Sequence, residues 1–161
     1  MRKTVFVTGA EGCGKTSLIP FLKDELEGFR INDFDEVGVP DNPPLQWRLD
    51  TTKYWLKIAN NNQKKGLDTL VAGLIFPCEV EKYEEHKSLD ITFILLDISV
   101  EERKKRLIKR KADEELINEP ERIGELRDDF KKTKFKNKII DVTNKSLEQT
   151  AKEINELTTY K

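Results

Sequence analysis

The sequence predicts an α/β fold in which helices cover both faces of a parallel β-sheet. Short runs of apolar and branched residues alternate along the chain with longer segments of helical periodicity, and this alternation is typical of strand–helix–strand units. A glycine-rich turn follows the first apolar run and leads directly into the first helical segment. The 161 residues are also of the size expected for one domain with a single core.

The elements are expected in a regular order. Strands buried on both faces of a parallel sheet are nearly all apolar, which places three of them at residues 4–9, 68–76 and 90–97. Two further short strands are expected at residues 29–33 and 137–143. In the first helical segment Leu18, Leu22 and Leu26 recur every four residues and share one face. Helices are expected over residues 15–28, 46–60, 99–117, 119–132 and 146–157. No repeat or long linker divides residues 1–161, so we expect a single domain.

The turn after the first strand reads GAEGCGKT at residues 9–16. A glycine, four residues and then Gly-Lys-Thr is the spacing of a loop whose backbone amides surround nucleotide phosphates. We expect Lys15 to reach the β- and γ-phosphates and Thr16 to ligate Mg²⁺, which makes ATP and Mg²⁺ the expected cofactors. The loop residues expected to bind the nucleotide are Gly9, Glu11, Gly12, Cys13, Gly14, Lys15, Thr16 and Ser17.

Two acidic residues, Asp33 and Asp35, follow the second strand in the sequence INDFDEVG. On extended backbone, residues two apart point in the same direction, so both carboxylates are expected near the bound phosphates. One carboxylate is expected to hold Mg²⁺, and the other to accept a proton from an attacking hydroxyl. The alternative is that either carboxylate caps a turn or a helix.

Cations crowd the helix expected over residues 99–117. Arg106 and Arg110 are one helical turn apart, and we expect both to neutralise charge on a transferring phosphoryl group. Arg103 and the lysines beside it are expected on a solvated face. Arg122 and Arg127 on the following helix are further candidates with less positional support.

Four segments together make the chain resemble the small P-loop kinases, a group that includes shikimate, gluconate, nucleoside and nucleotide kinases. They are the loop GAEGCGKT, the DFD after strand two, the block LLDISVEERKKRLIKR and the terminal IIDVTNKS. The resemblance covers nearly the whole chain. It implies a three-layer P-loop fold with strand order 2-3-1-4-5, an acceptor-binding segment at about residues 36–60, and a small lid at about residues 106–125. It also implies that Asp33 holds Mg²⁺ together with Thr16, that Asp35 orients or deprotonates the acceptor hydroxyl, and that Asn144, after strand five, lies near the adenine.

The chain departs from these kinases in two places. Ala72 and Gly73 stand at the end of strand three, where many of them carry an acidic residue for Mg²⁺. Kinases of the adenylate type also hold the acceptor's phosphate with two arginines. Arg48 could be the first, but the segment FPCEVEKYEEHK after strand three contains no arginine for the second.

We therefore expect transfer of the γ-phosphoryl group to a hydroxyl of a small metabolite or nucleoside, with Asp33, Asp35 and Arg48 as acceptor-binding residues. A nucleoside monophosphate kinase is the alternative within the same class. A non-catalytic ATP-binding module or an NTPase switch is the alternative of another class.

The composition excludes some partners and compartments. With 29 basic and 30 acidic side chains the net charge is −1, which gives no reason to expect nucleic-acid or membrane binding. Cys13 and Cys78 lack metal-ligand spacing, and a disulfide from within the glycine loop would be unusual. We therefore expect a cytoplasmic protein, monomeric or homodimeric, whose partner is a small-molecule acceptor.

Overall fold

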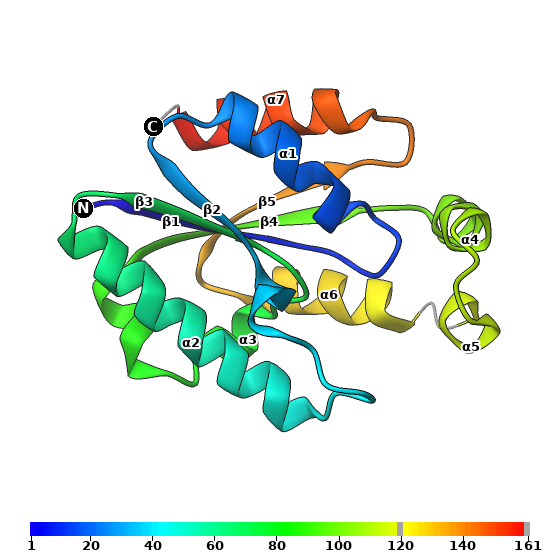
Figure 1. The fold of residues 1–161 in the computed structure, drawn as a ribbon, viewed down its shortest axis with the longest axis horizontal. Helices are drawn as coiled ribbons and strands as arrows, with labels where there is room; N and C mark the ends of the chain where they lie inside the picture. The colour runs from blue at the N-terminus through cyan, green and yellow to red at the C-terminus, as the bar shows by residue number, and fades with distance from the viewer. Residues whose placement is uncertain (119–120, 160–161) are drawn as a thin grey trace.

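The computed structural model describes residues 1–118 and 121–159 and contains a five-stranded sheet in which every strand pairing is parallel. The strand order is β2-β3-β1-β4-β5 (Figure 1), which confirms the predicted order. The strands are β1 (Lys3–Thr8), β2 (Phe29–Asp33), β3 (Asp68–Ala72), β4 (Asp90–Asp97) and β5 (Lys136–Asp141).

Helices cover both faces of the sheet, so the fold has three layers (Figure 1). On one face lie α1 (Lys15–Glu25) and α7 (Leu147–Thr159). On the other lie α2 (Leu45–Lys64), α3 (Pro77–Val80) and α6 (Glu121–Lys132). The predicted α/β fold class is therefore confirmed.

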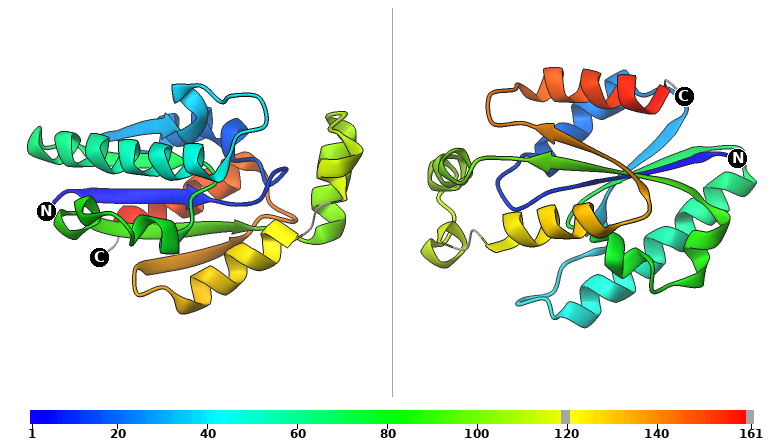
Figure 2. Two further views of the ribbon diagram at one scale, coloured as in Figure 1. Left: turned by 90° about the horizontal axis from the view of Figure 1, so that it is seen from below. Right: turned by 180° about the vertical axis from the view of Figure 1, so that it is seen from behind.

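The short helices α4 (Val100–Lys109) and α5 (Glu114–Ile117) stand at one end of the sheet, away from both chain termini (Figure 2). The sequence predicted one helix over residues 99–117. The backbone instead turns at Lys111, where φ is 58°, because a residue in the left-handed region ends an α-helix. The helix predicted over residues 119–132 is α6, and residues 119–120 lie outside the described part of the chain.

The core is divided by the sheet into two apolar layers. In β1, Val5 and Val7 pack with the side of α1 and α7, whereas Phe6 packs with the side of α2 and α6. The strands of the sheet centre are buried on both faces, because a parallel sheet covered by helices on both sides excludes water from each. This explains why β1, β3 and β4 read as apolar runs.

The third strand is shorter than its sequence suggested. Pairing with β1 ends at Ala72, although the apolar run continues to Phe76. After Ala72, the Gly73 amide donates to the Val7 carbonyl at 2.9 Å, and the Ile75 amide donates to the Thr8 hydroxyl at 2.9 Å. The side-chain bond to Thr8 turns the chain out of the sheet, directly beside the glycine loop.

No helix within residues 1–118 and 121–159 is long and apolar enough to cross a membrane.

Candidate functional site

The glycine loop, residues 9–16, connects the carboxyl end of β1 to the first residues of α1. Gly12 and Gly14 have φ values of 88° and 97°, a region that side chains other than glycine rarely adopt. At Gly9 a Cβ would lie 2.4 Å from the Cys13 sulfur and 2.9 Å from a backbone oxygen. No side chain caps the start of α1, so its first amides face the loop as an anion site.

A cavity of about 90 Å³ lies over this loop, and we name it the loop cavity. Its lining residues are Glu11, Gly12, Gly14, Lys15, Thr16, Ser17, Asp33, Asp35, Gly73 and Arg110. It therefore brings together six of the eight predicted nucleotide-binding residues with both predicted acids and one predicted arginine. Cys13 is instead buried in the core, where burial raises the pKa of its thiol.

The two cations in the loop cavity are held by the loop itself. The Lys15 ammonium donates to the Gly9 carbonyl, and Arg110 donates from Nη2 to the Glu11 carboxylate at 3.2 Å. Burial alone would raise the pKa of Glu11, but the charges of Lys15 and Arg110 hold it below its usual value. A phosphate that entered the cavity would meet both cations already in place.

Thr16 and Asp33 lie next to each other, as a shared Mg²⁺ ligation requires. The Thr16 hydroxyl donates to one Asp33 carboxylate oxygen at 3.1 Å. The described residues contain no cluster of three or more acidic, histidine or cysteine side chains that could hold a metal without a ligand. A hydroxyl and one carboxylate do suit Mg²⁺, because this ion takes few protein ligands and completes its shell with water and phosphate oxygens.

An acid at the end of β3 would not fit this structure. A Cβ at Gly73 would lie 2.2 Å from the Phe34 Cβ and 2.9 Å from its Cγ. Ala72 is 1% exposed and packs in the apolar layer with Val7. Phe34 therefore fills the space that a carboxylate at Gly73 would need.

The local geometry of the two acids differs from the prediction. Asp33 ends β2, but Asp35 lies in the 3₁₀ helix η1 (Phe34–Val37), so the backbone between them is not extended. The second Asp33 oxygen accepts from the Asp35 amide at 2.9 Å and caps η1. Both side chains still line the loop cavity, because the tight turn places them side by side. Burial, followed by the charges of Asp33 and Glu11, raises the pKa of Asp35.

A second cavity, of about 220 Å³, adjoins the first, and we name it the acceptor cavity. It shares Glu11, Lys15 and Asp35 with the loop cavity. Its other lining residues are Phe34, Val39, Pro43, Pro44, Leu45, Trp47, Arg48, Leu74 and Arg122. Most of these come from residues 34–48, within or just before the segment predicted to bind the acceptor.

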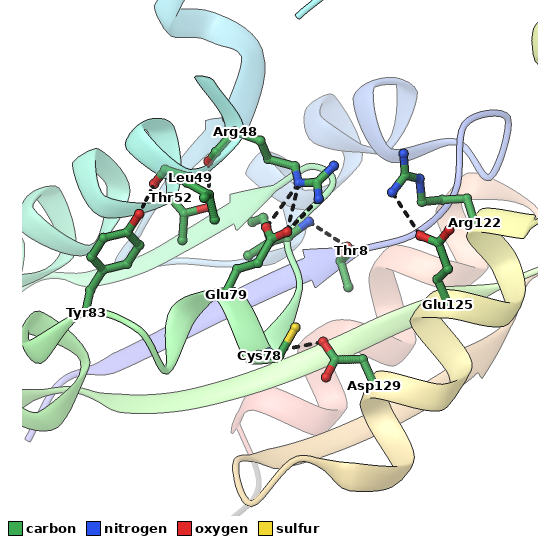
Figure 3. A network of polar contacts seen from close by, with 11 residues as sticks. Thr8, Arg48, Leu49, Thr52, Cys78, Glu79, Tyr83, Arg122, Glu125 and Asp129 are labelled. Atoms are coloured by element: carbon green, nitrogen blue, oxygen red, sulfur yellow. Dashed lines mark hydrogen bonds and ion pairs between the residues drawn. The ribbon is translucent and has the colours of Figure 1, made fainter. Parts of the chain in front are cut away.

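Two arginines reach the acceptor cavity, from opposite sides. Arg48, on α2, forms a bidentate pair with Glu79 on α3, and Arg122 on α6 pairs with Glu125 (Figure 3). Both guanidinium groups lie near the Phe76 ring, at 5.0 and 5.7 Å from its centroid. The sequence indicated no second arginine after strand three; tertiary packing supplies one from α6, a residue that we had placed among the weaker candidates.

Arg103 and Arg106 on α4, and Arg110 directly after it, attach that helix to the glycine loop. Arg103 Nε donates to the Glu11 carbonyl at 2.9 Å, and Arg106 Nη1 donates to the Cys13 carbonyl at 3.4 Å. Together with the Arg110–Glu11 pair, these contacts place the start of the predicted lid directly on the loop.

The prediction that Arg103 is solvated is wrong. Its side chain is 2% exposed. Leu107, four residues further along α4, is also fully buried. Residues four apart share one face of a helix, so the spacing between Arg103 and Leu107 was the signal that could have placed Arg103 on the buried face.

Arg106 and Arg127 lie outside the lining of both cavities. Arg106 Nη2 donates to the Val142 carbonyl at 3.0 Å, so it bridges the glycine loop and the segment after β5 that contains the exposed Asn144. Arg127 instead pairs with Asp97 at 2.8 Å. Of the predicted arginines, Arg110, the residue directly after α4, is thus the one that lines the loop cavity.

The likeness of this chain to known proteins is one of structure. No protein-family profile matches the sequence, and no curated protein sequence matches it. A sugar kinase from Janibacter sp. HTCC2649 superposes with a TM-score of 0.69 at 17% identity, covering 98% of this chain and 92% of its own. The tunicamycin resistance protein of Deinococcus radiodurans superposes with a TM-score of 0.70 at 15% identity, covering 100% and 98%.

Shikimate kinase from Acinetobacter baumannii, in complex with shikimate, has a TM-score of 0.60 at 18% identity and covers 98% of this chain and 93% of its own. Identities this low establish the fold alone. This chain has the three-layer fold of the P-loop kinases, and its coverage of these structures is close to complete.

Proposed function

We propose that this protein is an ATP-dependent phosphotransferase that moves the γ-phosphoryl group of Mg·ATP to a hydroxyl of a small molecule. The observation that supports this most directly is the pair of adjoining cavities that share Lys15, Asp35 and Glu11. A hydrolase or a nucleotide switch needs a phosphate site but has no use for a second cavity against the same carboxylate. A kinase needs both sites, with the reacting atoms at their junction.

The residues at the junction match the steps of in-line transfer. The acceptor hydroxyl forms a new bond to the γ-phosphorus, the bond to the oxygen shared with ADP breaks, and Asp35 takes the hydroxyl proton. Its raised pKa makes Asp35 a stronger base than an ordinary aspartate. Lys15 and Arg110 stabilise the charge of the transferring group.

Thr16 and Asp33 would hold Mg²⁺, which supplies positive charge for the β- and γ-phosphates. Their mutual hydrogen bond supports this assignment. Asn144 is proposed to contact the base. Arg106, which joins the Cys13 and Val142 carbonyls, is proposed to hold the loop and the segment after β5 together rather than to touch the transferring group.

One observation favours a nucleoside monophosphate kinase as a second candidate. Arg122 brings a second arginine to the acceptor cavity beside Arg48, and two arginines are what a phosphorylated acceptor requires.

The experiment is ADP formation from Mg·ATP against nucleosides, nucleoside monophosphates, sugars, sugar acids and aminoglycosides, with Lys15→Ala as the blank. One acceptor class that raises ADP release well above the rate with ATP alone is the expected result. Equal ADP release with and without every acceptor, while ATP still binds, would refute the transferase and leave a binding module or a hydrolase.

A further inference from the structure

We propose that the acceptor is an uncharged, partly apolar alcohol and that Glu79 sets this preference by neutralising Arg48. The inference rests on the proposed function and names the substrate class of the same site. Glu79 is a positioning residue, since it acts through Arg48 and does not itself line the cavity.

Arg48 is already occupied by a carboxylate from its own chain. Its Nε lies 3.2 and 3.0 Å from the two Glu79 carboxylate oxygens, and its Nη2 lies 2.5 Å from one of them. The Glu79 side chain is 7% exposed and the Arg48 side chain 18%. An anionic acceptor that replaced Glu79 on the guanidinium would leave a carboxylate buried and unpaired, and one that approached Nη1 would meet a guanidinium whose charge Glu79 already neutralises.

Phe76 holds the same guanidinium from its ring face, with the Arg48 Cζ 5.0 Å from the ring centroid. α3 begins directly after Phe76 and carries Glu79, so one short segment supplies both restraints. Within residues 1–118 and 121–159, Arg48 Nη1 makes no hydrogen bond, while Nε and Nη2 do. The two N–H groups of Nη1, on a neutralised pair, suit a hydroxyl or carbonyl oxygen, whereas an anion needs uncompensated charge.

The remaining charges of the acceptor cavity also oppose an anion. The carboxylates of Glu11 and Asp35 line the acceptor cavity, and the phosphates of bound ATP would pair with the Lys15 ammonium. Arg122 remains, but it pairs with Glu125 at 3.0 Å and is 38% exposed, so solvent screens it. With the nucleotide in place, a second anion would approach two carboxylates without a free cation to match it.

Apolar side chains make up most of the remaining wall. They are Phe34, Val39, Pro43, Pro44, Leu45, Trp47 and Leu74. Val39 is 48% exposed and Leu45 is 56% exposed. An acceptor with an apolar face would remove this surface from water, whereas a fully hydroxylated sugar would lose hydrogen bonds there.

The test is ADP formation from Mg·ATP with matched pairs that differ in one anionic group. The pairs are thymidine and thymidine monophosphate, adenosine and AMP, glucose and glucuronate, and benzyl alcohol and 4-(hydroxymethyl)benzoate. We expect the neutral member of the preferred pair to exceed its anionic partner at least about tenfold in kcat/KM, because the anion meets a neutralised arginine and two carboxylates. An anionic member that is the better substrate would overturn the proposal.

Glu79→Gln tests the role of the pair itself. It keeps hydrogen-bonding atoms but frees the charge of Arg48, so the ratio of anionic to neutral kcat/KM should rise about tenfold, through KM for the anionic member. Glu79→Asp keeps the charge and should keep the wild-type preference. Glu84→Gln, which breaks a fully solvated ion pair with Lys87, is the matched control. A purely structural role for Glu79 would lower both members of a pair alike, and that result would refute the assignment.

The two proposals fail differently. Activity with anionic acceptors alone would refute the neutral class and leave the phosphotransferase standing. No stimulation by any acceptor would refute both. If Glu79→Gln does not fold by circular dichroism, the wild-type ratio across the matched pairs still decides the substrate class.

Discussion

Gly73→Ala should disturb the candidate site, because the added Cβ would clash with Phe34. The added Cβ would lie 2.2 Å from the Phe34 Cβ, and ordinary contact begins at 3.4 Å, so Phe34 must retreat by about 1.2 Å. Phe34 is 1% exposed and belongs to the apolar layer beneath α2, which leaves it little room. Overpacking of this kind costs about 1–3 kcal/mol of folding stability.

The larger effect should fall on phosphoryl transfer, because Phe34 stands between Asp33 and Asp35 in the chain. A shift of its backbone moves both carboxylates, and misplacement by about 1 Å is enough to slow catalysis about 100-fold. The Gly73 Cβ would point at Phe34 and meet no residue of the glycine loop within its three nearest contacts. ATP affinity should therefore stay within about threefold of wild type, since the loop amides and Lys15 are undisturbed.

The assay combines three measurements: urea unfolding, ATP binding by calorimetry, and ADP formation with the best acceptor of the panel. Gly124→Ala is the matched control, because a Cβ there has no neighbour within 4 Å. Inside α6 that change should stabilise the protein by up to about 1 kcal/mol and leave turnover alone. Unchanged turnover in Gly73→Ala would refute the link from Phe34 to the two acids.

Three further predictions follow from the same geometry. The proposed base acts as a carboxylate, so kcat should fall as the pH drops through the raised pKa of Asp35. The acidic midpoint of the pH profile of kcat should therefore lie above pH 3.8, the ordinary value for an aspartate. A midpoint at or below that value would remove Asp35 as the base. Asp33→Asn should raise the Mg²⁺ concentration needed for half-maximal rate by about tenfold or more, because Thr16 loses its carboxylate neighbour. An unchanged Mg²⁺ titration would argue against Asp33 as a Mg²⁺ ligand. Arg103→Met removes two hydrogen bonds from a buried guanidinium to backbone carbonyls. It should lower the free energy of unfolding, measured by urea titration, by about 3 kcal/mol. Lys104→Met, at an exposed position, is the control, and equal stability of the two variants would contradict the prediction.

The local patterns of the chain were sufficient for the sheet and the loop. Buried strands, the glycine spacing and the acids after β2 each depend on a few consecutive residues, and such short-range signals survive any tertiary arrangement. The placement of Thr16 and Asp33 at one edge of the sheet also follows, because the carboxyl ends of all strands in a parallel sheet lie at the same edge. The geometry of Asp35 did not follow, since the Asp33 cap turns the chain into η1 one residue after the strand.

The acceptor cavity depended on pairs distant in sequence. Arg48 and Glu79 are 31 residues apart, and Arg122 reaches the same cavity from α6. The residues near Arg48 in the sequence do not show that Glu79 neutralises its charge. Those near Arg122 do not show that it reaches the acceptor cavity. Arg103 shows the same limit in another form: a cation in a basic helix reads as solvated unless the carbonyls that it binds are known.

The sequence by itself therefore determined the fold class, the strand order through its resemblance to the P-loop kinases, and most of the residues that line the loop cavity. Only the tertiary structure decided which charges remain available at the second cavity. The physical reason is that backbone conformation and phosphate binding use neighbouring residues, whereas a side chain's charge is set by whatever the fold brings against it. The contact of Glu79 with Arg48 decides it here.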